Sequence, residues 1–134
     1  MFSISIEPRF VETDALGHIN NTVLPVWFEQ ARTPIFQIFT PSLEIDKWEL
    51  ILAKIDVSFL GQIYYGKAVE IKTFIRSIGN TSFVVYHQAW QGGNKVAEGT
   101  AVLVNFDHTI QKSKPLDNDI KDALEKHIFS ENEV

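Results

Sequence analysis

One short segment combines a carboxylate with the start of a predicted helix. Asp14 lies in a turn-forming stretch from Thr13 to Asn21, and an apolar pattern with helical spacing follows. The first turn of a helix offers unpaired backbone N–H groups and the positive end of the helix dipole. These groups can stabilise the oxyanion that develops when a carbonyl carbon is attacked. A carboxylate on the other side of that carbonyl can activate water or attack the carbon itself. The two features serve one reaction only if the fold places a substrate between them.

The same residues also have structural interpretations. Asp14 can bond its own backbone, as aspartate in turns commonly does. Asn20 or Asn21 can cap the helix through its side chain, which leaves the main-chain N–H of Asn21 available to an oxyanion. Glu29, on an apolar helix, is either paired with Arg32 or another cation, or is a second carboxylate near the reacting group.

Several other kinds of site have no signature in the sequence. The chain has no cysteine, which excludes disulfides, thiolate metal sites and a cysteine nucleophile. His87, His108 and His127 are widely spaced and form no metal-binding pair, so we expect neither a metal nor a cofactor. A glycine-rich phosphate loop and the Gly-x-Ser-x-Gly motif of serine hydrolases are both missing.

Length and charge narrow the class of protein. The 134 residues, of which 45% are hydrophobic and 22% charged, predict a single globular domain over residues 1–134. The net charge of -5, with the basic residues spread along the chain, argues against nucleic acid. No apolar stretch approaches the roughly 20 residues needed to span a bilayer, so we expect no membrane partner. Met1 to Arg9 lacks signal-peptide features, and the missing cysteines suit the cytoplasm.

The helix that follows Asn21 is unusually apolar. Because its apolar surface is wider than a single stripe, we expect other elements to wrap it. Pro25 is tolerable only in the first turn, and Pro34 predicts a kink or a division of the helix. The apolar residues at helical spacing are Val23, Val26, Trp27, Ala31, Ile35 and Ile38.

The rest of the chain is mostly predicted strand. Gln91-Gly92-Gly93-Asn94 is a strong hairpin signal between the last two strands, and Asp117 to Phe129 predicts a short closing helix. The fold class is therefore α+β, with a five-stranded antiparallel sheet wrapped around a long central helix. Alternating apolar and polar residues predict a first strand that runs from Phe2 towards Phe10, and further strands at Ala53–Phe59, Val69–Arg76, Phe83–Trp90 and Val96–Phe106.

The sheet edges and the uncovered apolar surface of such a unit predict a partner subunit. We therefore expect at least a homodimer.

The run TDALGHINN, followed by WFEQAR, resembles the acyl-CoA thioesterases of the 4-hydroxybenzoyl-CoA thioesterase type, in the hotdog superfamily. Three later runs resemble family segments in the same order: FLGQIYYGKAVEI, GNTSFVVYHQAW and VAEGTAVLVNFD. The resemblance implies a hotdog fold and hydrolysis of acyl-CoA or acyl-carrier thioesters without a cofactor. It also implies a homodimer or homotetramer with the active site at a subunit interface.

The resemblance carries over to individual residues. Asp14 matches the catalytic aspartate, and Asn21 matches the position whose backbone N–H meets the thioester carbonyl. His18 and Asn20 match loop positions whose role, including substrate contact, varies between members, and Glu29 matches a common helical glutamate. The strand that lines the acyl pocket across the interface contains Val57, Ser58 and Phe59.

Two other functions suit the same scaffold. Hotdog dehydratases and hydratases pair a histidine with a carboxylate and act on β-hydroxyacyl thioesters. A binding module could retain the acyl-thioester pocket without turning substrate over. Release of free thiol from CoA esters distinguishes both from hydrolysis.

Overall fold

The computed structural model describes residues 1–131 as one antiparallel sheet with helices on one face. The strands are β1 (Phe2–Ile6), β2 (Leu50–Phe59), β3 (Val69–Ile78), β4 (Ser82–Gln91), β5 (Asn94–Asp107) and β6 (Lys112–Ser113). The α-helices are α1 (Leu24–Ala31), α2 (Thr33–Phe39) and α3 (Asn118–Glu125), and single 3-10 turns form η1 (Phe10–Glu12), η2 (Asn21–Val23) and η3 (Ile45–Lys47).

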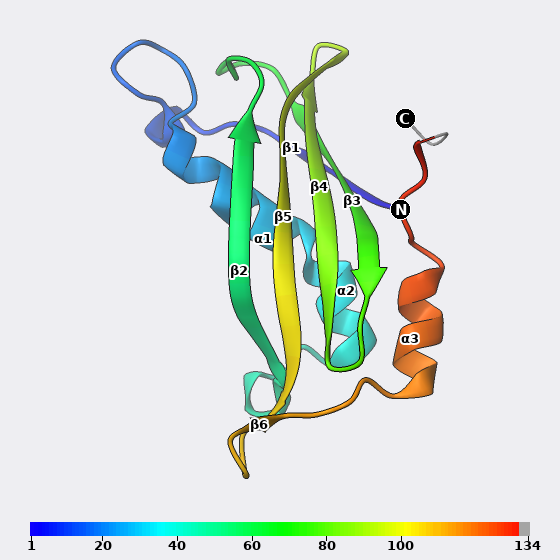
Figure 1. Cartoon of the computed structure of the whole chain (residues 1–134). Coiled ribbons are helices and arrows are strands. Elements are labelled where there is room, and N and C mark those ends of the chain that lie inside the picture. Colours follow the sequence, from blue (N-terminus) through cyan, green and yellow to red (C-terminus); the bar gives the residue numbers. More distant parts are fainter. Residues whose placement is uncertain (132–134) are drawn as a thin grey trace.

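The five long strands lie in the order β1-β3-β4-β5-β2, which confirms the predicted five-stranded sheet (Figure 1). Gly92 and Gly93 both have positive φ angles, 59° and 79°, and form the predicted tight turn between β4 and β5. The prediction missed β6, a two-residue strand that pairs with the end of β5. Two residues are too few to show an alternating pattern.

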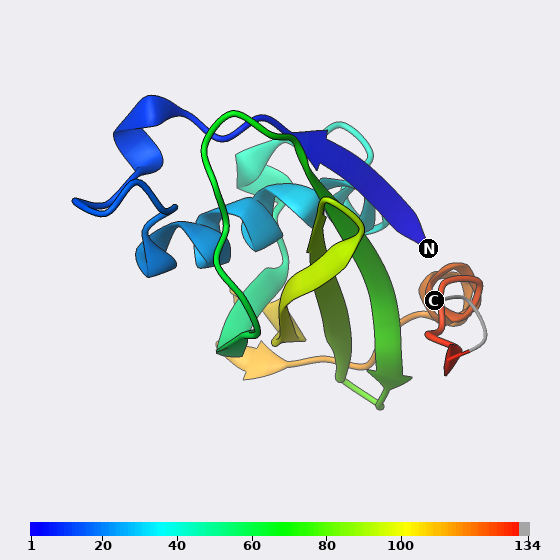
Figure 2. The ribbon, with the colours of Figure 1, turned by 90° about the horizontal axis from the view of Figure 1, so that it is seen from above.

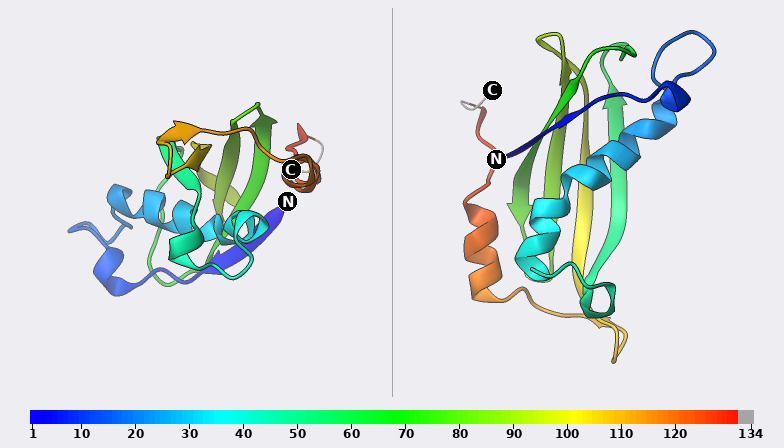
Figure 3. Two further views of the ribbon diagram at one scale, coloured as in Figure 1. Left: turned by 90° about the horizontal axis from the view of Figure 1, so that it is seen from below. Right: turned by 180° about the vertical axis from the view of Figure 1, so that it is seen from behind.

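The sheet curves around α1 and α2, which cross its concave face (Figures 2 and 3). Leu24, Trp27 and Phe28 of α1 are buried in one apolar cluster, and Ile35 of α2 is buried in a second. Gly99 of β5 allows the close approach of α1, because a Cβ there would lie 3.1 Å from the Phe28 ring. This arrangement is the hotdog architecture that the resemblance implies.

The central helix is divided at Arg32, as the prolines predict. Pro34 lies in the first turn of α2 and Pro25 in the first turn of α1, where the missing N–H costs least. Inside an unbroken helix the Pro34 ring would clash with the carbonyl of Gln30. The division therefore gives the two helical segments independent positions against the sheet.

The inner face of edge strand β2 is only partly covered. Its residues on that face pair with small or apolar β5 residues; Ile55, for example, lies opposite the buried Ala101. A register shift between Leu52 and Lys54 lets Leu52, before the shift, and Ile55, after it, lie on the same face. Leu52, Ile55 and Phe59 nevertheless remain 43%, 44% and 50% exposed.

The closing helix is shorter than predicted, because the residues after Glu125 bond to β3 instead. β1 pairs with β3 only as far as Thr73, which leaves the outer edge of Ile75 free. Ile75 donates its N–H to the His127 carbonyl and accepts from the Phe129 N–H, both at 2.8 Å. These bonds replace the predicted last turn of the helix.

Candidate active site

The loop that carries Asp14 is closed by hydrogen bonds to both its backbone and its side chain. The Asp14 N–H donates to the His18 carbonyl at 2.7 Å. Oδ1 of Asp14 accepts from the backbone N–H groups of Leu16 at 2.8 Å and His18 at 3.1 Å. The structural interpretation of Asp14 is therefore correct for one oxygen. Within residues 1–131 no hydrogen bond involves the other oxygen, Oδ2, which is available to a ligand or water.

The entrance to the helix begins with a 3-10 turn. The Asn20 side chain accepts from the Thr22 N–H at 3.0 Å and caps η2, so Asn20 rather than Asn21 is the cap. The α-helix itself begins at Leu24, after this turn. In the described part of the chain the backbone N–H of Asn21 has no acceptor. The free donor predicted at the helix start is therefore present in the preceding 3-10 turn.

These groups meet at a cleft of about 560 Å³ beside the end of β2. Figure 1 shows the blue loop next to the arrowhead of this strand. Asp14, Asn20, Asn21 and Phe59 all line the cleft, although Phe59 is distant in sequence from the other three. The fold thus brings the carboxylate and the free N–H to one cavity.

Three predicted substrate contacts do not line this cleft in the single chain. The ring of His18 packs edge-on against Tyr64, with ring centroids 5.2 Å apart, so its main contribution to the site is the backbone bond to Asp14. Val57 packs against the core on the inner face of β2. Ser58, the next residue along, points to the opposite face of the sheet.

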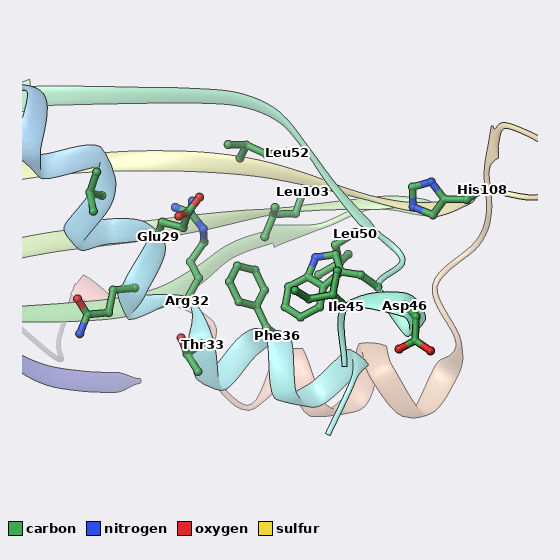
Figure 4. A pocket seen from close by; sticks show the side chains of 13 residues that line it. Glu29, Arg32, Thr33, Phe36, Ile45, Asp46, Leu50, Leu52, Leu103 and His108 are labelled. Carbon is green, nitrogen blue, oxygen red and sulfur yellow. The ribbon is translucent and has the colours of Figure 1, made fainter. Parts of the chain in front are cut away.

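Glu29 lies outside the cleft. It lines a separate groove of about 890 Å³ between the helices, η3 and β2, together with Arg32 (Figure 4). Among the described residues Glu29 makes no ion pair within 4 Å. The predicted pairing with a cation is therefore not formed.

Glu12 is a buried carboxylate that the sequence prediction missed. Its Oε1 accepts from the Arg9 backbone N–H at 2.7 Å and its Oε2 accepts from the Trp27 indole N–H at 2.9 Å. Burial alone would raise the pKa of Glu12, but the bonds from Arg9 and Trp27 and the Arg9 charge lower the pKa overall. Because Glu12 joins η1 to α1, it fixes the Asp14 loop against the helix.

A model of the thioesterase-like superfamily matches residues 8–124. The chain belongs to this superfamily. The matched range includes the whole Asp14 loop and all five long strands except β1. Membership in the thioesterase-like superfamily supports thioester hydrolysis as the general activity.

Solved structures agree with this family. A predicted thioesterase from Bacillus stearothermophilus is 41% identical, with a TM-score of 0.93, over 96% of this chain and 97% of that one. A thioesterase from Thermus thermophilus, complexed with coenzyme A and Zn, is 27% identical, with a TM-score of 0.82, over 92% and 96%. In sequence alone, the chain is also similar to YsmA, an uncharacterized protein of Bacillus subtilis (strain 168), with 23% identity over 92% of this chain and 84% of that protein.

In residues 1–131 no three His, Asp or Glu side chains gather where they could hold a metal ion. None of the helices in this range combines the length and apolarity needed to cross a membrane.

Proposed function

We propose that this protein hydrolyses acyl-CoA thioesters, with Asp14 as the catalytic carboxylate and the Asn21 backbone N–H as an oxyanion donor. The observation that carries the proposal is the shared cleft, where a carboxylate oxygen and a backbone N–H are both without protein partners among residues 1–131. A thioester carbonyl between them would meet a base or nucleophile on one side and a hydrogen-bond donor on the other.

In the general-base route, Oδ2 of Asp14 takes a proton from water as the water oxygen adds to the thioester carbon. The Asn21 N–H then stabilises the tetrahedral oxyanion. The C–S bond breaks, and the proton held by Asp14 returns to the thiolate. The products are a carboxylic acid and free coenzyme A.

In the nucleophilic route, Oδ2 itself attacks the thioester carbon and the thiolate leaves, which forms a mixed anhydride on Asp14. Water then hydrolyses the anhydride and regenerates the carboxylate. Turnover in 18O-labelled water distinguishes the two routes, provided that water attacks the Asp14 carbonyl carbon of the anhydride. In that case label enters the Asp14 carboxylate, whereas the general-base route leaves Asp14 unlabelled.

Coenzyme A is the proposed thiol because the thioesterase from Thermus thermophilus is complexed with coenzyme A. Its 27% identity extends over 92% of this chain.

We also propose that the working form contains at least two copies, joined through β2. This edge strand has no neighbour on its outer side within the described residues, and its inner apolar face is about half exposed at Leu52, Ile55 and Phe59. A second copy would cover this surface and bring its own β2 to the cleft, which suits the predicted pocket role of Val57 and Ser58. Sedimentation velocity at micromolar concentration tests this proposal, and a purely monomeric protein would contradict it.

A dehydratase has less support. That reaction pairs a histidine with the carboxylate, and none of the described residues lining the cleft is a histidine. His87, the most buried of the four histidines, lies on β4 beneath the helix and contacts Thr73 and Arg32 instead.

The decisive experiment compares the wild type with Asp14→Asn on CoA esters of several chain lengths and aryl groups, with free thiol as the readout. Asparagine retains an oxygen that can accept from Leu16 and His18, so the loop keeps its bonds while the base is lost. We expect a rate loss of about 100-fold or more. Asp122→Asn, an exposed change on α3, is the matched control and should retain full activity.

An unchanged rate in Asp14→Asn would remove this residue from the chemistry. Tight binding of an acyl-CoA by a wild type that releases no thiol would identify a binding module instead.

A further inference from the structure

Arg32, at the junction of α1 and α2, is a buried cation with few partners. Its side chain is only 3% exposed, and its Nε has no hydrogen-bond partner in the described chain. The guanidinium makes one hydrogen bond within residues 1–131, from Nη1 to Nε2 of His87 at 3.3 Å. An arginine normally uses several of its five N–H donors when it is buried. Arg32 therefore has unused donors in a place where water is scarce.

The partner of Arg32 cannot balance its charge. Burial, and then the nearby Arg32 charge, lower the pKa of His87 to about 3, so the imidazole is neutral at physiological pH. Because arginine always donates, Nε2 of His87 accepts, which leaves the proton on Nδ1 to be donated to Oγ1 of Thr73 at 2.9 Å. The Phe28 ring stacks on the His87 imidazole, with ring centroids 4.8 Å apart, and covers one face of the imidazole. The cluster fixes the position of the guanidinium without neutralising it.

No protein carboxylate pairs with Arg32 in the described residues. Burial lowers the pKa of Arg32, and the carboxylate of Glu29 raises it only in part. Glu29 lies one turn earlier on the helix but is exposed and does not come within 4 Å. An unpaired buried charge is costly, and a ligand anion is one way to compensate it.

Arg32 lines the large groove shown in Figure 4, whose other walls are mostly apolar. Phe36 of α2, Trp48 after η3 and Leu50 of β2 all line the groove and belong to one apolar cluster. The groove of about 890 Å³ is large enough for a medium-length apolar chain. Nε of Arg32 is buried, so a carboxylate in the groove would pair with the Nη atoms of the guanidinium.

We propose that this groove binds a carboxylate at the end of an unbranched apolar chain, with the carboxylate on Arg32 and the chain against Phe36, Trp48 and Leu50. The site is separate from the Asp14 cleft. Leu24 lines the cleft and Arg32 lines the groove, and their separation of eight positions corresponds to about 12 Å along a helix. The carboxylate belongs to a free carboxylic acid, because a chain that runs from Arg32 toward Phe36 and Trp48 leads away from the cleft at the start of α1 (Figure 4).

The test is calorimetric titration of the assembled wild-type protein with decanoate and with decan-1-ol, which share a chain and differ in charge. We expect decanoate to bind at least about 10-fold more tightly, the effect of a charge-assisted hydrogen bond. Arg32→Gln should reduce this preference to about 3-fold or less. Glu29→Gln, which removes the opposing charge in the groove, should increase it. Lys47→Gln, which removes an exposed cation next to groove residues 46 and 48, is the matched control and should change nothing.

Equal affinity for the acid and the alcohol, failure of the wild type to bind decanoate, or an undiminished preference in Arg32→Gln would each overturn the proposal. If Arg32→Gln does not fold, Ile45→Trp provides the test, because Ile45 is exposed, lines the groove and lies outside the β2 surface proposed to meet a second copy. It should weaken both ligands at least about 10-fold, and unchanged binding would place the ligand elsewhere.

The binding experiment does not need turnover, so failure of the proposed hydrolysis and failure of the groove site give different results.

Discussion

Replacing Glu12 by glutamine tests how the Asp14 loop is held against the helix. The side chain keeps its size but loses its charge and one of its two acceptor oxygens. In the wild type these oxygens accept separately, from the Arg9 N–H at 2.7 Å and the Trp27 indole at 2.9 Å. The amide NH2 of glutamine must face one of these donors, which is then unsatisfied. We expect the free energy of unfolding to fall by about 2–3 kcal/mol, or the Tm by roughly 6–15 °C.

The measurement is urea unfolding at pH 7, with Glu7→Gln as the control, since Glu7 is exposed. Trp27→Phe removes the indole donor, so in that background Glu12→Gln should cost less: the remaining amide oxygen can serve the Arg9 N–H. Equal costs in both backgrounds would show that the bond from Trp27 contributes nothing. The hydrolysis rate should fall as well, because η1 precedes the Asp14 loop directly.

The pH dependence gives an independent check. The pKa of Glu12 in the folded protein is lowered below its usual 4.5. Its stabilisation is therefore complete above about pH 4.5 and is lost as the pH falls through the lowered pKa. The difference between wild type and Glu12→Gln should accordingly shrink in acid. A difference that stays constant from pH 7 to pH 3 would refute the assigned hydrogen bonds.

Three further predictions concern other parts of the fold. Gly99→Ala should destabilise the protein by about 1–3 kcal/mol in urea unfolding, because its Cβ would collide with the Asp56 carbonyl, whereas Gly61→Ala has room and should be near neutral. His87 has a folded pKa of about 3, below its usual 6.5, so the unfolded chain binds more protons between these values. Relative to His87→Gln, the wild type should therefore lose about 1.4 kcal/mol per pH unit as the pH falls from 6.5 toward 3, and a pH-independent difference would contradict the buried neutral imidazole. Asn21→Pro should lower kcat about 100-fold by removing the proposed oxyanion donor, and near wild-type turnover in a variant with a normal melting curve would exclude that role.

The parts of the site that the sequence predicts are local. Asp14 bonds residues two and four positions later, and Asn20 bonds Thr22, so composition and spacing are enough to suggest both turns. The proline positions similarly indicate where the helix must divide. Such features depend on residues that are close together along the chain, so they can be predicted from the sequence.

The parts that escaped prediction depend on distant segments. Glu12 and Trp27 are fifteen residues apart, and neither residue type by itself predicts the hydrogen bond from the Trp27 indole to the Glu12 carboxylate. The early end of α3 depends on an edge of β3 that β1 leaves open. The spacing of Glu29 and Arg32 suggests an ion pair, but Arg32 turns inward toward His87. The direction in which the Arg32 side chain points is decided by the packing of the helix against the sheet.

The two oxygens of Asp14 show why the choice of substitution matters for any test of catalysis. One oxygen organises the loop, and the other is free in the cleft within the described part of the chain. Alanine would remove both, so lost activity in Asp14→Ala could follow from a disordered loop as readily as from a missing base. Asparagine keeps the loop acceptor and removes the basicity, so its effect on rate reports the chemistry. If Asp14→Asn retained the melting temperature and lost turnover, while Asp14→Ala lost both, the structural and the proposed catalytic roles of this one residue would be separated.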